Sequence, residues 1–228
     1  LLSDFSFIIS VFRVFVDCSY SVTVQEYKEF YLPSKKPSIV TVPKMNFVAV
    51  RGEGDPNVEG GAYKRAIETL YALSFTIKMS KMTDWRIEGY FDYVVPPLEG
   101  FWRQRGGGDI DYTDKSSFEW ISVIRLPDFV TKADFERAVE TAQRKKGRDF
   151  SEAEFLTIEE GLCVQIMHIG SYDSEPASIA LMDEYIALSG YVNDFSDLRR
   201  HHEIYLSDPR RAKPEGLKTV IRHPIRKA

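Results

Sequence analysis

The chain has 228 residues, so it is long enough to bury about 70% of its unfolded surface without a disulfide or metal. Its formal net charge of −4 and pI of about 5.7 argue against direct binding to DNA or RNA, which favours a basic face. Two cysteines, Cys18 and Cys163, cannot form a disulfide framework, and we therefore expect a reducing, cytoplasmic location.

The first 26 residues allow two interpretations. Their apolar stretch, Phe5 to Val16, is interrupted by Arg13, is too short to span a bilayer, and lacks the basic region that precedes a signal sequence. We therefore expect no membrane association. Because no Met precedes Met45, residues 1–26 are either an extension of doubtful status or a real N-terminal segment with a strand at Val11 to Val16.

The first half of the remaining chain predicts the order strand, helix, strand, strand. β-Branched and apolar runs indicate the strands, and three-and-four spacing of apolar residues indicates the helix. The predicted elements are a strand over 38–51, a helix over 61–81, a strand over 86–95 that stops at Pro96 and Pro97, and a strand over 118–126. The last strand has apolar residues on both faces, which is typical of a central strand.

The second half repeats that order. A connecting helix over 131–147 comes first, with Thr131 as its N-cap and a basic C-terminal end. A strand over 161–169, a helix over 175–188, and strands over 200–206 and 217–222 follow. We predict one α+β domain over 27–228, with β-α-β-β repeats at 38–126 and 161–223. The repeats would form a pseudo-two-fold antiparallel sheet with helices on one face and a ligand groove on the other.

Four segments resemble the GyrI-like small-molecule-binding family. They are VTVPKMNFVAVRGEGDPN (40–57), IEGYFDYVVPPLEGFW (87–102), HIGSYDSEP (168–176) and HHEIYLSDPRR (201–211). The first two are similar to the stand-alone branch of that family, which includes hydrolases that open the cyclopropane ring of DNA-alkylating natural products. The resemblance also implies a relation to multidrug-sensing regulators and to a gyrase-inhibitory protein, and it places the glutamate of the family's pocket at Glu203.

The residues around Glu203 support a pocket on their own grounds. In a strand, His201, Glu203 and Tyr205 share one face, while His202, Ile204 and Leu206 share the other. His201 and His202 therefore cannot chelate one metal together, and we expect no metal and no cofactor. A carboxylate in the middle of a sheet is costly, so if Glu203 is buried we expect a raised pKa. The alternative is an exposed edge-strand glutamate paired with Arg210 or Arg211.

Aromatic residues supply the remaining candidates. Aromatic walls bind planar or cationic ligands through stacking and ring-quadrupole attraction. We predict catalytic roles for Glu203 and Tyr172, and ligand contacts from Tyr90, Phe91, Trp102, Trp120, His201 and Tyr205. Core packing is the alternative for each aromatic ring. The glycine run 106–108 lacks a following Lys-Ser or Lys-Thr and is expected to be a flexible loop that covers the pocket.

Three functions remain open from the sequence. The leading hypothesis is a small-molecule-binding protein that detoxifies cyclopropane-bearing alkylating compounds by hydrolysis. The second is a non-catalytic binder or sensor of lipophilic cationic drugs. The third is a regulator that contacts a gyrase-like protein partner, for which a net charge of −4 is too small to support mimicry of DNA.

Overall fold

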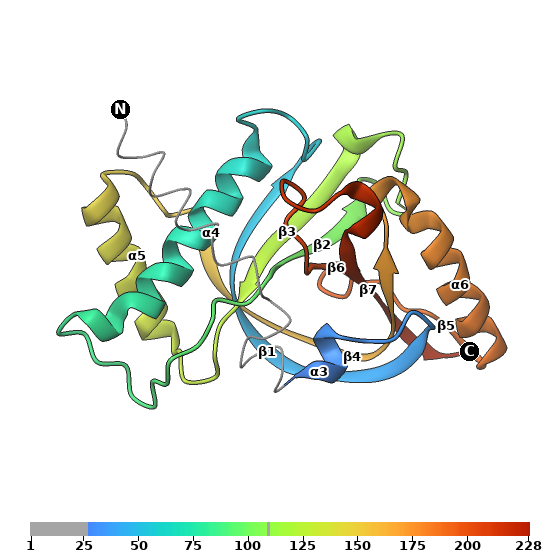
Figure 1. Ribbon diagram of the computed structural model, residues 1–228, viewed down its shortest axis with the longest axis horizontal. Coiled ribbons are helices and arrows are strands. Elements are labelled where there is room, and N and C mark those ends of the chain that lie inside the picture. The colour runs from blue at the N-terminus through green and yellow to red at the C-terminus, as the bar shows by residue number, and fades with distance from the viewer. Residues whose placement is uncertain (1–26, 109) are drawn as a thin grey trace.

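The computed structural model describes residues 27–108 and 110–228, and the strand predicted at Val11 to Val16 lies outside these residues. The helices are α3 (Lys28–Tyr31), α4 (Ala62–Lys78), α5 (Lys132–Lys146) and α6 (Glu175–Leu188), with short 3-10 turns η2 (Met79–Met82), η3 (Lys115–Ser117), η4 (Tyr172–Ser174) and η5 (Pro214–Gly216). The strands are β1 (Ser38–Glu53), β2 (Leu98–Gln104), β3 (Phe118–Arg125), β4 (Ala153–Ile169), β5 (Tyr191–Asn193), β6 (His201–Tyr205) and β7 (Lys218–Lys227) (Figure 1).

Six strands close into a small antiparallel barrel in the order β4-β1-β3-β2-β6-β7. Closure depends on the length of β4, which pairs with β1 over Ala153–Gln165 and with β7 over Cys163–Ile169. The short strand β5 adds to the outer edge of β7. The mixture of helices and antiparallel sheet confirms the predicted α+β class, whereas the pseudo-two-fold relation of the repeats stays a prediction.

Most predicted elements are present, but the strand predicted over 86–95 is wrong. This segment makes no ladder, and β2 begins only after the two prolines, at Leu98. Its apolar residues Ile87, Tyr93 and Val95 are instead buried in the core cluster that includes the inner face of α4. The apolar pattern therefore reflects burial of an irregular segment and not strand pairing. The α5 prediction is confirmed in detail, since Thr131 and Asp134 form a capping box.

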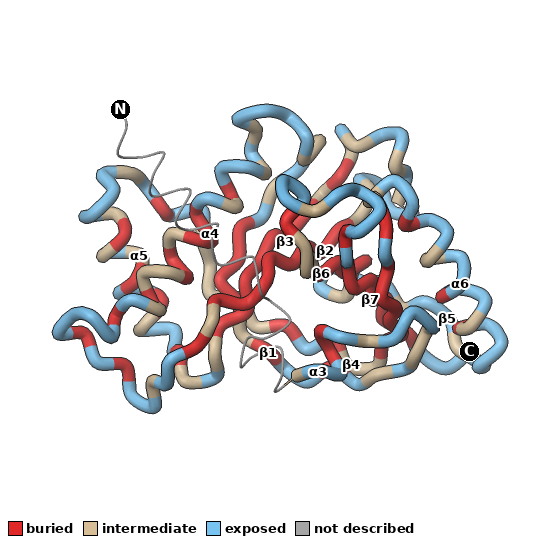
Figure 2. The backbone as a smooth tube through the Cα atoms, in the orientation of Figure 1, coloured by how far each residue is buried: buried red, intermediate tan, exposed pale blue. Residues whose placement is uncertain are grey.

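The helices lie on the outer side of the barrel (Figure 1). α4 packs on β1, β3 and α5, whereas α6 packs on β4 and β5. Figure 2 shows the buried backbone running through the strands between these two groups. The opposite face of the sheet is the barrel interior, filled by side chains such as Phe47, Phe101 and Val123. In the described residues this face is therefore closed, and the expected groove does not lie there. None of the described helices has the length and apolar character needed to cross a membrane.

The barrel interior also contains a buried ionic network, which we call the interior network. Both ring nitrogens of His202 lie 3.0 Å from carboxylate oxygens, Nδ1 from Glu160 and Nε2 from Glu99. Arg222 donates to the second Glu160 oxygen at 2.8 Å, and Tyr31 donates to Glu99 at 2.9 Å. Because both nitrogens face acceptors, His202 is an imidazolium that donates twice.

Charge balance explains why these ions tolerate burial. Burial opposes ionisation of Glu160, but His202 and Arg222 outweigh it and lower its pKa to about 2. Burial likewise disfavours the charged form of His202, yet Glu160 and Glu99 raise the pKa of His202 above its ordinary value. Arg222 also donates to the backbone oxygen of Phe30 at 2.7 Å, so the network fastens α3 to the barrel.

Replacing Glu160 with Gln tests the contribution of the interior network to stability. The change leaves Arg222 and His202 as buried cations with one carboxylate between them. We expect the free energy of unfolding to fall by about 3–5 kcal/mol in urea denaturation at neutral pH. The matched control is Glu154→Gln, which breaks an exposed pair with Arg51 and should cost less than about 1 kcal/mol. Equal effects of the two substitutions would contradict this account.

Candidate functional site

The candidate site lies on the outer side of β6, in the strip of sheet between α4 and α6. His201, Glu203 and Tyr205 face this side, while His202 and Ile204 face the barrel interior, as the strand period predicts. β6 is flanked by β2 and β7, so Glu203 is not on an edge strand. Its exposed fraction is only 8%, which excludes the alternative of a solvated surface glutamate.

The positive charges named in that alternative are engaged elsewhere. Arg210 pairs with Asp208 at 2.7 Å, and Arg211 lies 3.7 Å from the same carboxylate. Glu203 instead accepts hydrogen bonds from His201 Nε2 at 2.9 Å and from Tyr205 Oη at 2.7 Å. Two neutral or cationic donors therefore hold the carboxylate in place.

A second carboxyl group, Glu175, lies against Glu203. It is the first residue of α6 and is fully buried, and its carboxylate, that of Glu203 and the imidazole of His201 present atoms within 4.8 Å of one another. Two carboxylates this close in a buried site cannot both ionise easily, so one of them retains a proton. Oxygen Oε1 of Glu175 is buried without a hydrogen-bond partner among the described residues, which a neutral carboxylic acid tolerates better than a carboxylate.

The surroundings decide which carboxyl keeps the proton. Burial and the negative charge of Glu203 raise the pKa of Glu175 well above its ordinary value. Burial also opposes ionisation of Glu203, but hydrogen bonds from His201, Tyr205 and Glu175 outweigh it and lower its pKa. The predicted raised pKa of Glu203 is therefore wrong, because the strand supplies donors that sequence alone did not place. The neighbouring Glu175 is the carboxylic acid.

Sequence analysis missed Glu175 as a functional residue. The glutamate stands inside the quoted segment 168–176, directly before Pro176, where it reads as an ordinary acidic residue in the first turn of a helix. Its total burial depends on how α6 packs against β4 and β5. The sequence signal that could have identified Glu175 is its position inside segment 168–176, which carries the family resemblance.

His201 is held by a second histidine, which was also missed. His201 Nδ1 lies 2.7 Å from His223 Nε2 on the neighbouring strand β7. Burial and the nearby His201 lower the pKa of His223 well below its ordinary value, so His223 is neutral. One proton lies between His201 Nδ1 and His223 Nε2, and His201 Nε2 donates to Glu203.

Two tryptophans form the floor of the site beside the carboxylates. The indole of Trp102 donates to Tyr205 Oη at 3.0 Å and lies over Gly100, which pairs with Glu203 across the sheet. Trp120 lies one strand further away and packs edge-on against Tyr63 of α4, with ring centroids 5.1 Å apart. The structure therefore brings both predicted tryptophans to the helix side of the sheet.

Three tyrosines cover the carboxylates at the mouth of the site. Tyr63 is contributed by α4, Tyr112 by the β2–β3 connection, and Tyr172 by the turn before α6. Tyr112 Oη lies 3.4 Å from Glu175, and the Tyr172 ring meets Tyr205 edge-on at 5.7 Å. All three are half-buried, so each ring has one side toward the site and one side toward solvent. The connection that carries the glycine run thus covers the site.

These tyrosines keep their protons. Burial raises the pKa of Tyr63, Tyr112 and Tyr172, and the charge of Glu203 acts in the same direction. Burial and Glu203 likewise raise the pKa of Tyr205. The site therefore combines one carboxylate, one carboxylic acid and several hydroxyl donors.

The two remaining predicted contacts lie elsewhere. Tyr90 donates to the backbone oxygen of Lys78 at the end of α4 and packs against Phe129. Phe91 is 46% exposed and also packs against Phe129, at 5.2 Å. Both belong to the irregular segment before β2 and not to the surroundings of Glu203. The error follows from the strand wrongly predicted over 86–95.

Glu175, His201 and Glu203 are also the group of described residues that could hold a metal ion. Two carboxylates and an imidazole suit a divalent transition metal. In the structure, Glu203 accepts from His201 and Tyr205, and Glu175 lies beside them. The arrangement is therefore compatible with acid–base chemistry by the side chains themselves.

Comparison with known proteins identifies relatives along most of the chain. A family model described as GyrI-like small molecule binding domain matches residues 35–226. An uncharacterized conserved protein from Listeria innocua is 46% identical, with a TM-score of 0.83 over 89% of this chain and 98% of that chain. Two structures named as a hydrolase from Listeria innocua are 44% and 45% identical, with TM-scores of 0.81 and 0.82 over the same shares. No curated protein matches the chain.

Replacing Gly100 with Ala tests the packing of the site floor. The added Cβ would lie 2.5 Å from Trp102 Nε1 and 3.1 Å from Tyr205 Oη, so the indole must move away from Tyr205. We expect a loss of about 1–3 kcal/mol in the free energy of unfolding by urea denaturation. The control is Gly216→Ala, where the added Cβ meets open space and should change stability by less than about 0.5 kcal/mol. An unchanged Gly100→Ala variant would contradict the described packing.

Proposed function

Because the chain belongs to the GyrI-like small-molecule-binding family, we propose that it binds a planar organic molecule over Glu203 and hydrolyses it by opening a strained cyclopropane ring. The observation that carries this proposal is the buried pair of one carboxylate and one carboxylic acid, Glu203 and Glu175. Relatives at 44% and 45% identity bear the name hydrolase, which supports a hydrolytic reaction.

The residues around the pair suit a flat, mostly apolar ligand. Trp102 and the half-buried rings of Tyr63 and Tyr172 offer aromatic faces and edges on several sides of the carboxylates. Each good aromatic contact contributes about 0.5–1.5 kcal/mol beyond area burial. Insertion of the ligand would displace the tyrosine rings that cover Glu203. Tyr112 is carried by a loop that also forms an ion pair with the turn that precedes α6, between Lys115 and Asp173.

The acid–carboxylate pair provides both proton transfers that the ring opening needs. The Glu203 carboxylate accepts a proton from water as the water oxygen bonds to the cyclopropane CH2 carbon. The C–C bond that breaks releases its electron pair into the conjugated ring system and onto the carbonyl oxygen. The Glu175 carboxylic acid donates its proton to that oxygen, which becomes a hydroxyl. One water is added overall, and the pair is restored when Glu203 returns a proton to Glu175.

Hydrogen-bond donors around Glu203 stabilise its negative charge. Tyr205 and His201 hold Glu203 as the base, and they do so before substrate arrives. Tyr172 keeps its proton and faces Tyr205, so its hydroxyl is a second donor toward the carbonyl oxygen of the ligand. Positioning of water and substrate between these groups supplies much of the rate enhancement without a covalent intermediate. Such a reaction would detoxify DNA-alkylating compounds.

Turnover of a cyclopropane-bearing alkylating compound tests this proposal. Protein and compound are incubated, and mass spectrometry measures the product that has gained one water. We expect Glu203→Gln to lower kcat by about 10²–10⁴, because an amide cannot accept the proton from water. Glu175→Gln should also lower kcat, because the proton for the ligand carbonyl oxygen must then come from solvent. The loss should be larger at higher pH, where solvent supplies this proton less readily.

The matched control is Glu154→Gln, a surface carboxylate on β4 that should leave turnover unchanged. Circular dichroism and urea denaturation establish that each variant is folded. Full turnover by folded Glu203→Gln would overturn the proposed role of the carboxylate.

A non-catalytic binder of lipophilic cations is the second candidate, because an ionised, enclosed carboxylate among aromatic rings also attracts a cation. For this function the ligand would be recovered unchanged. Since the pKa of Glu203 lies below its ordinary value, its negative charge is present at neutral pH and lost only as the pH falls through that lowered value. We expect ethidium affinity, measured by fluorescence titration, to be present at neutral pH and to weaken only in acid, below the pH at which an ordinary glutamate takes up a proton. Glu203→Gln should bind weakly at every pH, and a pH-independent wild type would contradict this role.

A further inference from the structure

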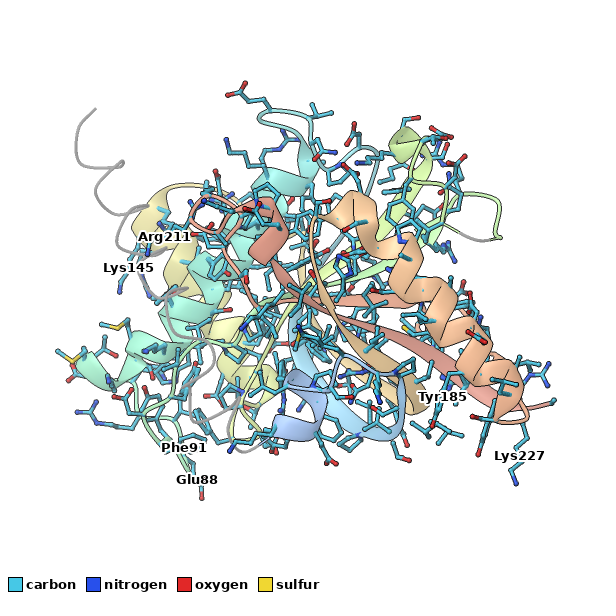
Figure 3. The ribbon with its side chains drawn as sticks, turned by 45° about the vertical axis from the view of Figure 1, so that its right-hand side comes forward. Glu88, Phe91, Lys145, Tyr185, Arg211 and Lys227 are labelled. Atoms are coloured by element: carbon cyan, nitrogen blue, oxygen red, sulfur yellow. The ribbon has the colours of Figure 1, made fainter. Side chains whose placement is uncertain are left out.

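A cavity on the opposite side of β3 from the Glu203 site contains a poorly paired buried cation. The cavity has a volume of about 100 Å3 and lies where β3 ends and the next loop begins. Its lining residues are Tyr27, Phe91, Pro96, Arg125, Leu126, Pro127, Asp128 and Phe129. Figure 3 shows Phe91 at the periphery of the molecule, on the opposite side from Tyr185 of α6.

Arg125 is the charged residue of this cavity that is buried. Its side chain is 4% exposed, and its guanidinium lies 3.8 Å from the centre of the Tyr27 ring. Its nearest carboxylate oxygen belongs to Asp128, at 3.5 Å from Nη2, and Asp128 is 72% exposed. Nitrogens Nε and Nη1 have no hydrogen-bond partner among the described residues. Burial opposes this charge, but Tyr31, Tyr27 and Asp128 outweigh burial and raise the pKa of the guanidinium. The charge is therefore retained while two of its donor nitrogens stay without an acceptor in the described part of the chain.

The contrast with Arg222 shows that this is not the usual state of a buried arginine in this fold. Arg222 is equally buried, and its guanidinium donates to Glu160, to Gln165 and to the backbone of Phe30. A buried donor without an acceptor is unfavourable. An anion that enters the cavity would offer acceptors to Nε and Nη1 of a guanidinium that is already charged, which gives the cavity a preference for negative charge.

We propose that this cavity is a second ligand site, which binds a small carboxylate with an apolar body. The carboxylate pairs with Arg125, and the body lies against Phe91, Phe129 and the two prolines. The volume is of the order of the cavities that admit a benzene ring. An aromatic carboxylate thus matches both the charge and the walls.

The second site is independent of the Glu203 site. Arg125 faces the inner side of β3, whereas Trp120 and Ser122 of the same strand face the outer side toward α4. The two sites also prefer opposite charges, since one contains a carboxylate and the other a guanidinium. Failure of the hydrolytic proposal would therefore leave this inference untouched.

Isothermal titration calorimetry with sodium benzoate tests the second site, at an ionic strength held constant with sodium chloride. We expect Arg125→Gln to weaken benzoate binding by about tenfold or more, because the charge-assisted hydrogen bonds are lost. Asp128→Asn should strengthen binding several-fold, because it removes the carboxylate that competes for Arg125. Inorganic phosphate should bind more weakly than benzoate, since it has no apolar body.

Two controls complete the design. Arg137→Gln removes an exposed arginine of α5 and should bind benzoate like the wild type, which excludes general charge attraction. Glu203→Gln should also bind benzoate like the wild type, which separates the two sites. Absence of benzoate binding to the wild type, or equal affinity of folded Arg125→Gln, would overturn the inference. If Arg125→Gln does not fold, the Asp128→Asn variant serves as the test. Benzoate binding by this variant that is unchanged or weaker than that of the wild type would overturn the inference.

Discussion

Strand β6 carries ionisable groups on both of its faces, and the burial of these groups constrains the rest of the structure. His202 is directed into the barrel, where Glu99 and Glu160 hold it as a cation. Glu203, the next residue, is directed outward, where His201 and Tyr205 hold it as an anion. Neither charge is tolerable in a protein core without its own donors or acceptors, so the neighbouring strands must supply them at fixed positions.

The two sets of partners explain why the inner side of the sheet is structural and the outer side is the candidate functional site. Inside, cations and carboxylates balance, every strong bond is internal, and the network links α3 to the barrel. Outside, two carboxyl groups meet without a cation of fixed charge, and the raised pKa of Glu175 lets it stay protonated beside the Glu203 carboxylate. The inner groups are bonded to one another and have few free donors or acceptors for a ligand. The outer carboxyl groups can still exchange a proton, and they lie beneath the rings of Tyr63, Tyr112 and Tyr172.

Local sequence patterns were sufficient to predict the three long helices and the grouping of His201, Glu203 and Tyr205 on one face of their strand, but not that this face is the one the helices cover. Helical spacing gave α4 and α6, the Thr131 cap gave α5, and the period of two placed His201, Glu203 and Tyr205 on one face. Trp102, predicted as a ligand contact, lies beside Tyr205 in the structure because Gly100 leaves room for its indole, and its contact with a ligand stays a prediction. These features depend on residues that are close in sequence.

The features that sequence did not predict depend on tertiary contacts. Burial of Ile87 and Tyr93 produced an apolar pattern like that of a strand, although the segment forms no ladder. Glu175 became a partner of Glu203 only because α6 begins at the site, and the same contact reversed the expected direction of the Glu203 pKa. Closure of the barrel required β4 to extend from one neighbour to another, which no single segment of sequence indicates.

The alternation of charge along β6 has a further consequence for folding. A slip of this strand by one residue would turn Glu203 inward, toward Glu99 and Glu160, and would move His202 away from both of them. The same slip would turn His201 inward, so three buried carboxylates would face one imidazole and the guanidinium of Arg222, and buried negative charge would exceed positive charge. The order His-His-Glu therefore helps to fix the register of β6, in addition to the hydrophobic pattern that fixes register in ordinary strands.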